Sequence, residues 1–447
     1  MKKSTWRQHH KWLGIVLAPF IILFCFSGIV LNHAGLLADV NISRKLLPAE
    51  YRYDRWNKGL LRGTMKWNCK TLIYGNSGIW LKEESNGTIR DFNRGLPNGA
   101  DHRSIRGVVS MPNGFLYAIS QYNLYCLNEC GAWMRIDLPN DEHERLSDIT
   151  QKNDSLIITG RSHIYLSHVP YHTFQKITLK KGGNDKGKVS LFRTTWLLHG
   201  GGLFGIVGKL FVDLVGLILL FLSISGIYYS FAPRPHSSFG ARIKSWLIKW
   251  HNQIGWASIF FLLLLTITGW MLRPPALIAI ASAKIPPIPF SAMDSDNPWN
   301  DCLRSLRYDD DKEDWLLCTS DGFYSLRHLS DTPQKEQVQP PVSVMGINVE
   351  QKDSRHKWLI GSFSGLYVWD RPHEEVTDYF THHAPQPTSE MPISSHPISG
   401  FSSDIEDAEL VVDYNKGCPR LSMPNIMATL PMSLRNVCIE VHTGRIF

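Results

Sequence analysis

The chain has 447 residues, of which 43 % are apolar and 19 % charged, so it is long enough for several domains. Its net charge of +7 is largely explained by basic residues that flank apolar segments. The charge therefore indicates no nucleic-acid partner.

Three segments have the roughly 20 apolar residues that a membrane-spanning helix needs. Residues 12–31 and 254–272 carry no charge, and residues 210–231 carry only Asp213. A cleaved signal peptide is the alternative for the first segment, because basic residues precede it. Its apolar run is long for a signal peptide and no Ala-x-Ala site follows, so we predict an uncleaved anchor.

Basic residues near the ends of these segments predict the orientation, because short cytoplasmic segments carry an excess of Lys and Arg. They predict an inner-membrane protein whose N-terminus is cytoplasmic and whose large domains are periplasmic. The predicted division is 1–33 for the N-terminus and first helix, 34–195 for the first half of an exported β domain, 196–231 for the second helix with its outer His-Gly motif, 232–250 for a cytoplasmic basic loop, 251–274 for the third helix, and 275–447 for the second half of the β domain, which ends at the start of a fourth helix.

A strand-turn-strand pattern recurs in the exported parts, in copies that begin near residues 71, 115, 155, 315 and 358. Aligned on a shared leucine, neighbouring copies within each half lie 44, 40 and 43 residues apart. This spacing predicts an all-β domain of four-stranded units, arranged as an interrupted β-propeller. A pair of unrelated β-sandwiches is the alternative, and a degenerate sixth copy begins at Glu409.

Of the eight cysteines, Cys25 lies in the first membrane segment and seven lie in the exported parts. An oxidising compartment would allow disulfides between Cys126 and Cys130, Cys302 and Cys318, or Cys418 and Cys438, although sequence does not fix the connectivity. No Cys-x-x-Cys-His motif occurs, which excludes covalent c-type haem.

Histidines repeat at the ends of the membrane segments. His10 and His251 each precede a glycine, Gly28 or Gly269, by 18 residues, so the first and third helices look like copies. His199 and His442 both begin the motif His-x-Gly-x-x-Phe, once before the second helix and once at residues 442–447. A four-helix unit built from a duplicated pair is implied, with its last helix absent from the sequence.

The predicted topology places His10 and His251 at the cytoplasmic ends of their helices, and His33, His199 and His442 on the outer side. His10 and His33 are about 35 Å apart along the first helix, which spans one hydrocarbon core. Haem b suits such positions, because its iron accepts neutral imidazole on both axial sides and the apolar porphyrin fits between helices. We therefore predict two haem b groups that form an electron path across the bilayer.

The roles of these residues stay open. Any single histidine at a membrane interface can serve merely as an amphipathic anchor. His33 has no counterpart in the repeat, so it either ligates the outer haem, assists a substrate or caps its helix. Asp213 is either a functional residue that faces the bundle interior or a polar residue near the outer interface.

At these motifs the chain resembles the PepSY-associated transmembrane family. The similar segments are HKWLG and SGIVLNH in the first helix, LHGGGLFGIVGKLFVDLVGLILLFLSISGIYY in the second, WHNQIGW and TITGW in the third, and the final SLRNVCIEVHTGRIF. The resemblance implies a haem-binding inner-membrane protein of the kind that reduces ferric siderophores or related iron complexes. It assigns His10 and His251 to an inner haem, and His199 with His442 or His33 to an outer one. Two departures are the missing fourth helix and the lack of the family's small α/β exported domain.

The favoured function is transmembrane electron transfer from an unidentified donor to a ferric chelate or siderophore, without catalytic acid or base residues. Membrane lipid is the only other partner predicted. The alternative is a membrane-anchored binding or sensing module without redox activity, and a lesser one is a protein that passes haem on.

Overall fold

The computed structural model describes residues 3–139, 144–182, 187–231, 238–343, 346–385, 395–405 and 408–446. The chain forms two compact units. The helical unit comprises Met1–Ala38, Lys188–Asp294 and Leu434–Phe447, and the β unit comprises Asp39–Gly187 and Ser295–Ser433.

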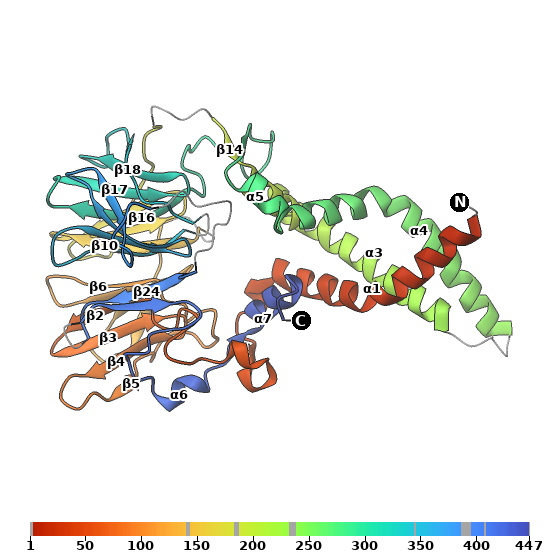
Figure 1. Ribbon diagram of the computed structural model, residues 1–447, viewed down its shortest axis with the longest axis horizontal. Helices are drawn as coiled ribbons and strands as arrows, with labels where there is room; N and C mark the ends of the chain where they lie inside the picture. Colours follow the sequence, from red (N-terminus) through yellow and green to blue (C-terminus); the bar gives the residue numbers. More distant parts are fainter. Residues whose placement is uncertain are drawn as a thin grey trace. The chain divides into compact units, whose positions relative to one another are not determined.

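Three long helices form the framework of the helical unit: α1 (Lys3–Asn32), α3 (Gly205–Phe231) and α4 (Ser238–Met271). Both α1 and α4 pack against α3 (Figure 1). Among the described residues, these segments are the ones long and apolar enough to cross a membrane. Large apolar side chains such as Ile206, Trp256 and Phe260 are exposed on them, as expected for helices whose surroundings are lipid. The predicted three-helix membrane anchor is confirmed.

Short elements complete this unit. The helices α2 (Leu191–His199) and α5 (Ala276–Ala281) pack against α4, whereas α7 (Leu434–His442) packs against α1. The remaining short elements are η1 (Ala34–Leu37), η4 (Gly202–Phe204), and the paired strands β14 (Val189–Ser190) and β15 (Lys284–Ile285). Within the predicted segment 196–231, the chain is interrupted between α2 and α3, because Gly201 and Gly205 of the His-Gly motif adopt φ angles of +74° and +63° that interrupt a right-handed helix.

The division into units differs from the predicted boundaries. Residues 188–195, 275–294 and 434–447 belong with the helices, because α2, α5 and α7 pack on α4 and α1. Part of the predicted basic loop over 232–250 is helical, since α4 begins at Ser238. Apolar side chains recur there at the helical period, and residues 232–237 lie outside the described part.

The β unit is built mainly of five antiparallel four-stranded sheets, in which the strands follow one another in chain order. The first sheet contains β2 (Gly63–Trp67), β3 (Lys70–Gly75), β4 (Gly78–Glu83) and β5 (Ile89–Asp91). The second contains β6 (Gly107–Ser110), β7 (Leu116–Ile119), β8 (Leu124–Leu127) and β9 (Trp133–Ile136). The third contains β10 (Leu146–Lys152), β11 (Ser155–Gly160), β12 (Ile164–His168) and β13 (Gln175–Ile177). The fourth sheet contains β16 (Leu303–Asp309), β17 (Asp314–Thr319), β18 (Gly322–Leu326) and β19 (Gln334–Lys335). The fifth contains β20 (Ile347–Lys352), β21 (Trp358–Ser362), β22 (Gly365–Asp370) and β23 (Glu375–Asp378).

Smaller elements complete the β unit. They are the two-stranded sheet of β24 (Ile398–Ser402) and β25 (Leu410–Asp413), the pair of β1 (Asn41–Ile42) and β26 (Met432–Ser433), and the short helices η2 (Arg44–Leu46), η3 (Ala49–Tyr51) and α6 (Asn425–Ala428). The five repeated sequence copies are the second and third strands of the four-stranded sheets, and the degenerate copy at Glu409 contains β25.

Six clusters of buried apolar side chains hold these sheets together. Each of five clusters joins one sheet to the next, and the sixth joins β24 and β25 to the first sheet. Because both faces of a sheet are covered, its central strands are apolar throughout; every residue of β17 and β21 is buried. The predicted all-β domain is confirmed, whereas its closure as a propeller stays a prediction.

All eight cysteines are free in this structure, including the six for which disulfides were considered. Cys418 lies in the β unit and Cys438 lies on α7 of the helical unit, so these two belong to different units.

Glu350 on β20 gives the β unit a testable pH dependence. Its side chain is buried beside Arg307 and Asp148, and burial raises its pKa to about 7. A carboxyl whose pKa is higher in the folded protein than in the unfolded chain adds stability below the unfolded pKa, and this stability is lost as the pH rises through 7. We expect Glu350→Gln to raise the free energy of unfolding at pH 8 by on the order of 3 kcal/mol and to change it little at pH 5.

Chemical unfolding of the two proteins at both pH values measures this difference. Glu375→Gln is the matched control, because Glu375 is exposed on β23. A wild-type stability that is flat between pH 5 and pH 8 would contradict the prediction.

Candidate functional site

The histidines form two pairs in the helical unit. The rings of His10 on α1 and His251 on α4 have centroids 6.1 Å apart at an interplanar angle of 64°. The rings of His199 and His442, the last residues of α2 and α7, have centroids 6.0 Å apart at 52°. Four of the five predicted histidines therefore meet two by two.

The two pairs lie at different levels of the bundle. The ring of His442 lies against Gly28 on α1, and that of His199 lies against Gly269 on α4. Each glycine is 18 residues beyond a histidine of the other pair on the same helix. At 1.5 Å per residue the levels are about 27 Å apart along either helix.

His442 is held by a small polar patch on α1. Its Nδ1 lies 2.9 Å from the carbonyl oxygen of Phe24 and 3.2 Å from Oγ of Ser27. A Cβ at Gly28 would stand only 3.0 Å from the ring. Because residues i, i+3 and i+4 share one face of a helix, carbonyl, hydroxyl and glycine form one surface for the imidazole. We call this arrangement a hydroxyl–glycine patch.

The same patch recurs on α4, where it holds His199. Nδ1 of His199 lies 3.2 Å from the carbonyl oxygen of Leu265 and 3.1 Å from Oγ1 of Thr268. A Cβ at Gly269 would stand 2.9 Å from the ring, so only glycine leaves room for it.

A third patch lies on α3 and holds His251. Nδ1 of His251 is 2.9 Å from Oγ of Ser225, and a Cβ at Gly226 would be 3.5 Å from the ring. The patches thus serve three of the four paired histidines.

These contacts fix which ring nitrogen carries the proton. A carbonyl oxygen only accepts hydrogen bonds, so Nδ1 of both His442 and His199 must donate. The hydroxyl of Ser225 donates to the carbonyl of Phe221 at 2.6 Å, so its oxygen accepts from Nδ1 of His251. In the neutral imidazole the proton is then on Nδ1, and Nε2 keeps the lone pair that a metal ligand needs.

The distance within each pair also suits a shared metal ion. Two imidazoles that bind one ion from opposite sides, with metal–nitrogen bonds of about 2 Å, have ring centroids roughly 6 Å apart. The observed centroid separations of 6.1 and 6.0 Å agree with that value. Their role as ligands stays a prediction.

His33 and Asp213 form a separate cluster. Nε2 of His33 lies 2.6 Å from Oδ2 of Asp213, and the side-chain amide of Asn32 donates to Oδ1 at 2.8 Å. Asp213 is buried on α3, so it faces the bundle interior rather than the lipid. Nε2 of His33 is occupied by the carboxylate, which distinguishes His33 from the paired histidines.

Sequence reasoning missed the role of the hydroxyl groups. Ser27 and Thr268 directly precede the two glycines of the repeat, Gly28 and Gly269, but the sequence predicted no contact for their hydroxyl groups. A third dipeptide of a hydroxyl residue and glycine, Ser225-Gly226, lies near the end of the second helix and carries the same signal. The contact between His33 and Asp213 has no local signature.

The family of the chain follows from a comparison with known families. The model of the PepSY-associated TM region matches residues 142–447, which is more than half of the chain. The chain belongs to the PepSY-associated TM family. It is thus a membrane-anchored member of that family, and the match says nothing of haem or iron reduction.

Solved structures add little to the family assignment. The chain is similar to the extracellular domain of a hybrid two-component system from B. thetaiotaomicron, with 10 % identity, 82 % of this chain and 38 % of that one covered, and a TM-score of 0.37. It is also similar to PorZ, a surface component of the type-IX secretion system of Porphyromonas gingivalis, with 12 % identity, coverages of 82 % and 38 %, and a TM-score of 0.34. The chain thus spans well under half the length of either structure, and neither informs its function. No curated protein matches the chain.

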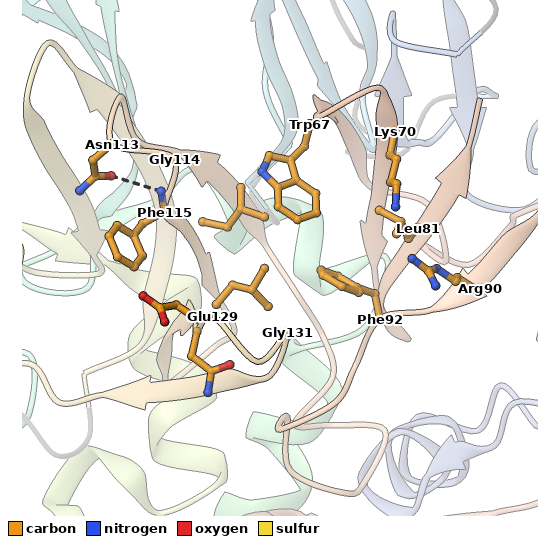
Figure 2. Close-up of a pocket in the computed structure, with 13 residues that line it drawn as sticks. Trp67, Lys70, Leu81, Arg90, Phe92, Asn113, Gly114, Phe115, Glu129 and Gly131 are labelled. Atoms are coloured by element: carbon orange, nitrogen blue, oxygen red, sulfur yellow. Dashed lines mark hydrogen bonds between the residues drawn. The ribbon is translucent and has the colours of Figure 1, made fainter. Parts of the chain in front are cut away.

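The β unit of this PepSY-associated TM protein has an open hollow between its first two sheets. Figure 2 shows Trp67 and Phe92 from the first sheet and Phe115 from the second along its sides. Lys70 and Arg90 at its edge both form ion pairs with Glu83, at 3.3 and 3.1 Å. The hollow contains none of the predicted site residues.

The tight contact between glycine and imidazole can be tested on α1. We expect Gly28→Val to lower the stability of the bundle by roughly 1–3 kcal/mol, because the new side chain displaces the ring of His442. Gly14→Val on the same helix is the matched control, since no atom lies within 4 Å of a Cβ there. Thermal unfolding in detergent measures both, and equal melting temperatures for the two variants would contradict the packing.

Proposed function

We propose that each histidine pair binds one haem b and that the protein carries electrons across the membrane to reduce a ferric chelate or siderophore in iron uptake. The observation that carries this proposal is the pairing itself. Two pairs of imidazoles stand at two levels of a membrane bundle, and hydroxyl–glycine patches leave Nε2 available on His251, His199 and His442.

The donor set supports haem rather than a bare metal ion. Among the described residues, no group of three or more His, Cys, Asp or Glu side chains is placed to hold a metal. Two axial imidazoles suffice for haem iron, because the porphyrin supplies the other ligands. Bound haem would supply a one-electron Fe(III)/Fe(II) couple whose potential depends on axial ligands and burial.

The protein's own residues would orient and tune such a group. The patches fix the tautomer and the plane of each imidazole, and a hydrogen bond to Nδ1–H makes an imidazole a stronger donor. Asp213, Asn32 and His33 would form a separate polar cluster in the bundle, apart from the two histidine pairs. Basic residues near the helix ends favour a cytoplasmic N-terminus in the inner membrane, so electrons would enter at the pair of His10 and His251.

The second candidate is a membrane-anchored periplasmic module that binds or senses a partner without redox chemistry. The larger β unit and the family match favour it, because neither requires a cofactor. In that case the histidine pairs would be packing contacts between helices.

A visible spectrum of the detergent-purified full chain, oxidised and then dithionite-reduced, separates the two functions. The proposal predicts two low-spin b haems per chain. We expect His251→Ala to remove one haem and His199→Ala to remove the other, because each loses an axial ligand.

His33→Ala is the matched control, since its Nε2 is bound to Asp213, and it should keep both haems. Absence of haem from wild-type protein made in haem-supplied cells would refute the redox function and leave the binding module. Loss of haem in His33→Ala alone would show that the pairs are wrongly assigned.

A further inference from the structure

The β unit contains a group of arginines that the histidine sites do not involve. Arg62, Arg106 and Arg145 each stand directly before the first strand of a sheet, β2, β6 and β10. These first strands pack against one another in succession, and β10 packs against β16, which contains Arg304 (Figure 1). The backbone N–H of Arg161 donates to the carbonyl of Arg145 at 2.9 Å, which adds a fifth guanidinium. We call Arg62, Arg106, Arg145, Arg161 and Arg304 the arginine cluster.

Few carboxylate groups form ion pairs with the arginine cluster. Among the described residues, Arg161 pairs with Asp301 at 3.2 Å, and no ion pair is formed by Arg62, Arg106, Arg145 or Arg304. Arg304 donates only to the carbonyls of Asp301 and Leu303, both at 2.9 Å. By contrast, the buried Arg371 of the β unit binds three carboxylates, those of Asp309, Asp314 and Glu336.

The guanidinium groups are also incompletely hydrogen-bonded. Nε of Arg62 and Nε of Arg106 are buried, and neither has a hydrogen-bond partner among the described residues. An unpaired buried donor is expensive, and so are like charges held close together. Burial first, and then the charges of Arg62, Arg161 and Arg145, lower the pKa of Arg106 to about 9. All five arginine residues are partly rather than fully buried.

We infer that the arginine cluster is a binding site for a small polyvalent oxyanion, carrying carboxylate or phosphate groups, between the first strands of the β unit. Such an anion would supply the hydrogen-bond acceptors that the guanidinium groups lack. Each guanidinium group can bind a carboxylate or phosphate group through two parallel hydrogen bonds, which suits a site made of several arginines. The inference does not depend on the histidine pairs or on haem.

Isothermal titration of the full chain in detergent, with citrate in one arm and inorganic phosphate in the other, tests the site. We expect one anion to bind per chain, and Arg106→Gln to weaken the affinity at least about tenfold by removing one charged fork. Binding of citrate alone identifies a carboxylate ligand, and binding of phosphate alone identifies a phosphate ligand. Arg135→Gln, an exposed arginine on β9, is the matched control and should bind as the wild type does.

Thermal unfolding separates binding from a structural role. Without anion, Arg106→Gln should be at least as stable as the wild type, because it removes like-charge repulsion. The bound anion should raise the melting temperature of the wild type only. Failure of both anions to bind, or an equal loss of affinity in Arg135→Gln, would overturn the inference, as would destabilisation of Arg106→Gln with no anion effect on the wild type.

Discussion

The helical unit depends on one constraint: the Nδ1–H of an imidazole that packs between apolar helices must find an acceptor. An unsatisfied N–H costs free energy in such surroundings, and helix carbonyls already accept from the backbone. Three of the four paired histidines meet the constraint with a serine or threonine hydroxyl beside a glycine. For His442 and His199, the helix carbonyl one turn before the glycine is a second acceptor. Gly28, Ser27 and the carbonyl of Phe24 are the clearest case.

This constraint also fixes which end of each imidazole is available for chemistry. A ring anchored through Nδ1 turns Nε2 outward, whereas a ring anchored through Nε2 does the reverse. His442 and His199 belong to the first kind, and His33, held by Asp213, belongs to the second. The same bundle therefore holds imidazoles anchored through Nδ1 and one imidazole paired with a carboxylate through Nε2. Counting histidines at helix ends would not separate these two kinds, but the identity of the anchoring atom does.

The sequence predicted whatever depends on local pattern. Uncharged runs gave the three membrane helices, and a period near 40 residues gave the four-stranded units, because both follow from spacing along the chain. It did not predict the break at Gly201 and Gly205 or the packing of α5 and α7 with the helices. It left the partner of His199 open between His33 and His442. In the structure the ring of His199 meets that of His442, and His33 instead contacts Asp213, 180 positions away in the chain. Such contacts leave no trace in local composition, so only the folded chain reveals them.

Buried polar groups are treated differently in the two units, and the difference bears on function. In the helical unit, the Nδ1–H groups of His442, His199 and His251 have acceptors on the neighbouring helix. In the β unit Arg371 forms ion pairs with three carboxylates, whereas Arg62 and Arg106 form no ion pair among the described residues. A protein that neutralises one buried arginine so fully has the means to neutralise the others. Among the described residues, several guanidinium groups lack a carboxylate partner, which favours an anionic ligand for them. Since this argument uses no residue of the bundle, it stands whether or not the histidine pairs hold haem.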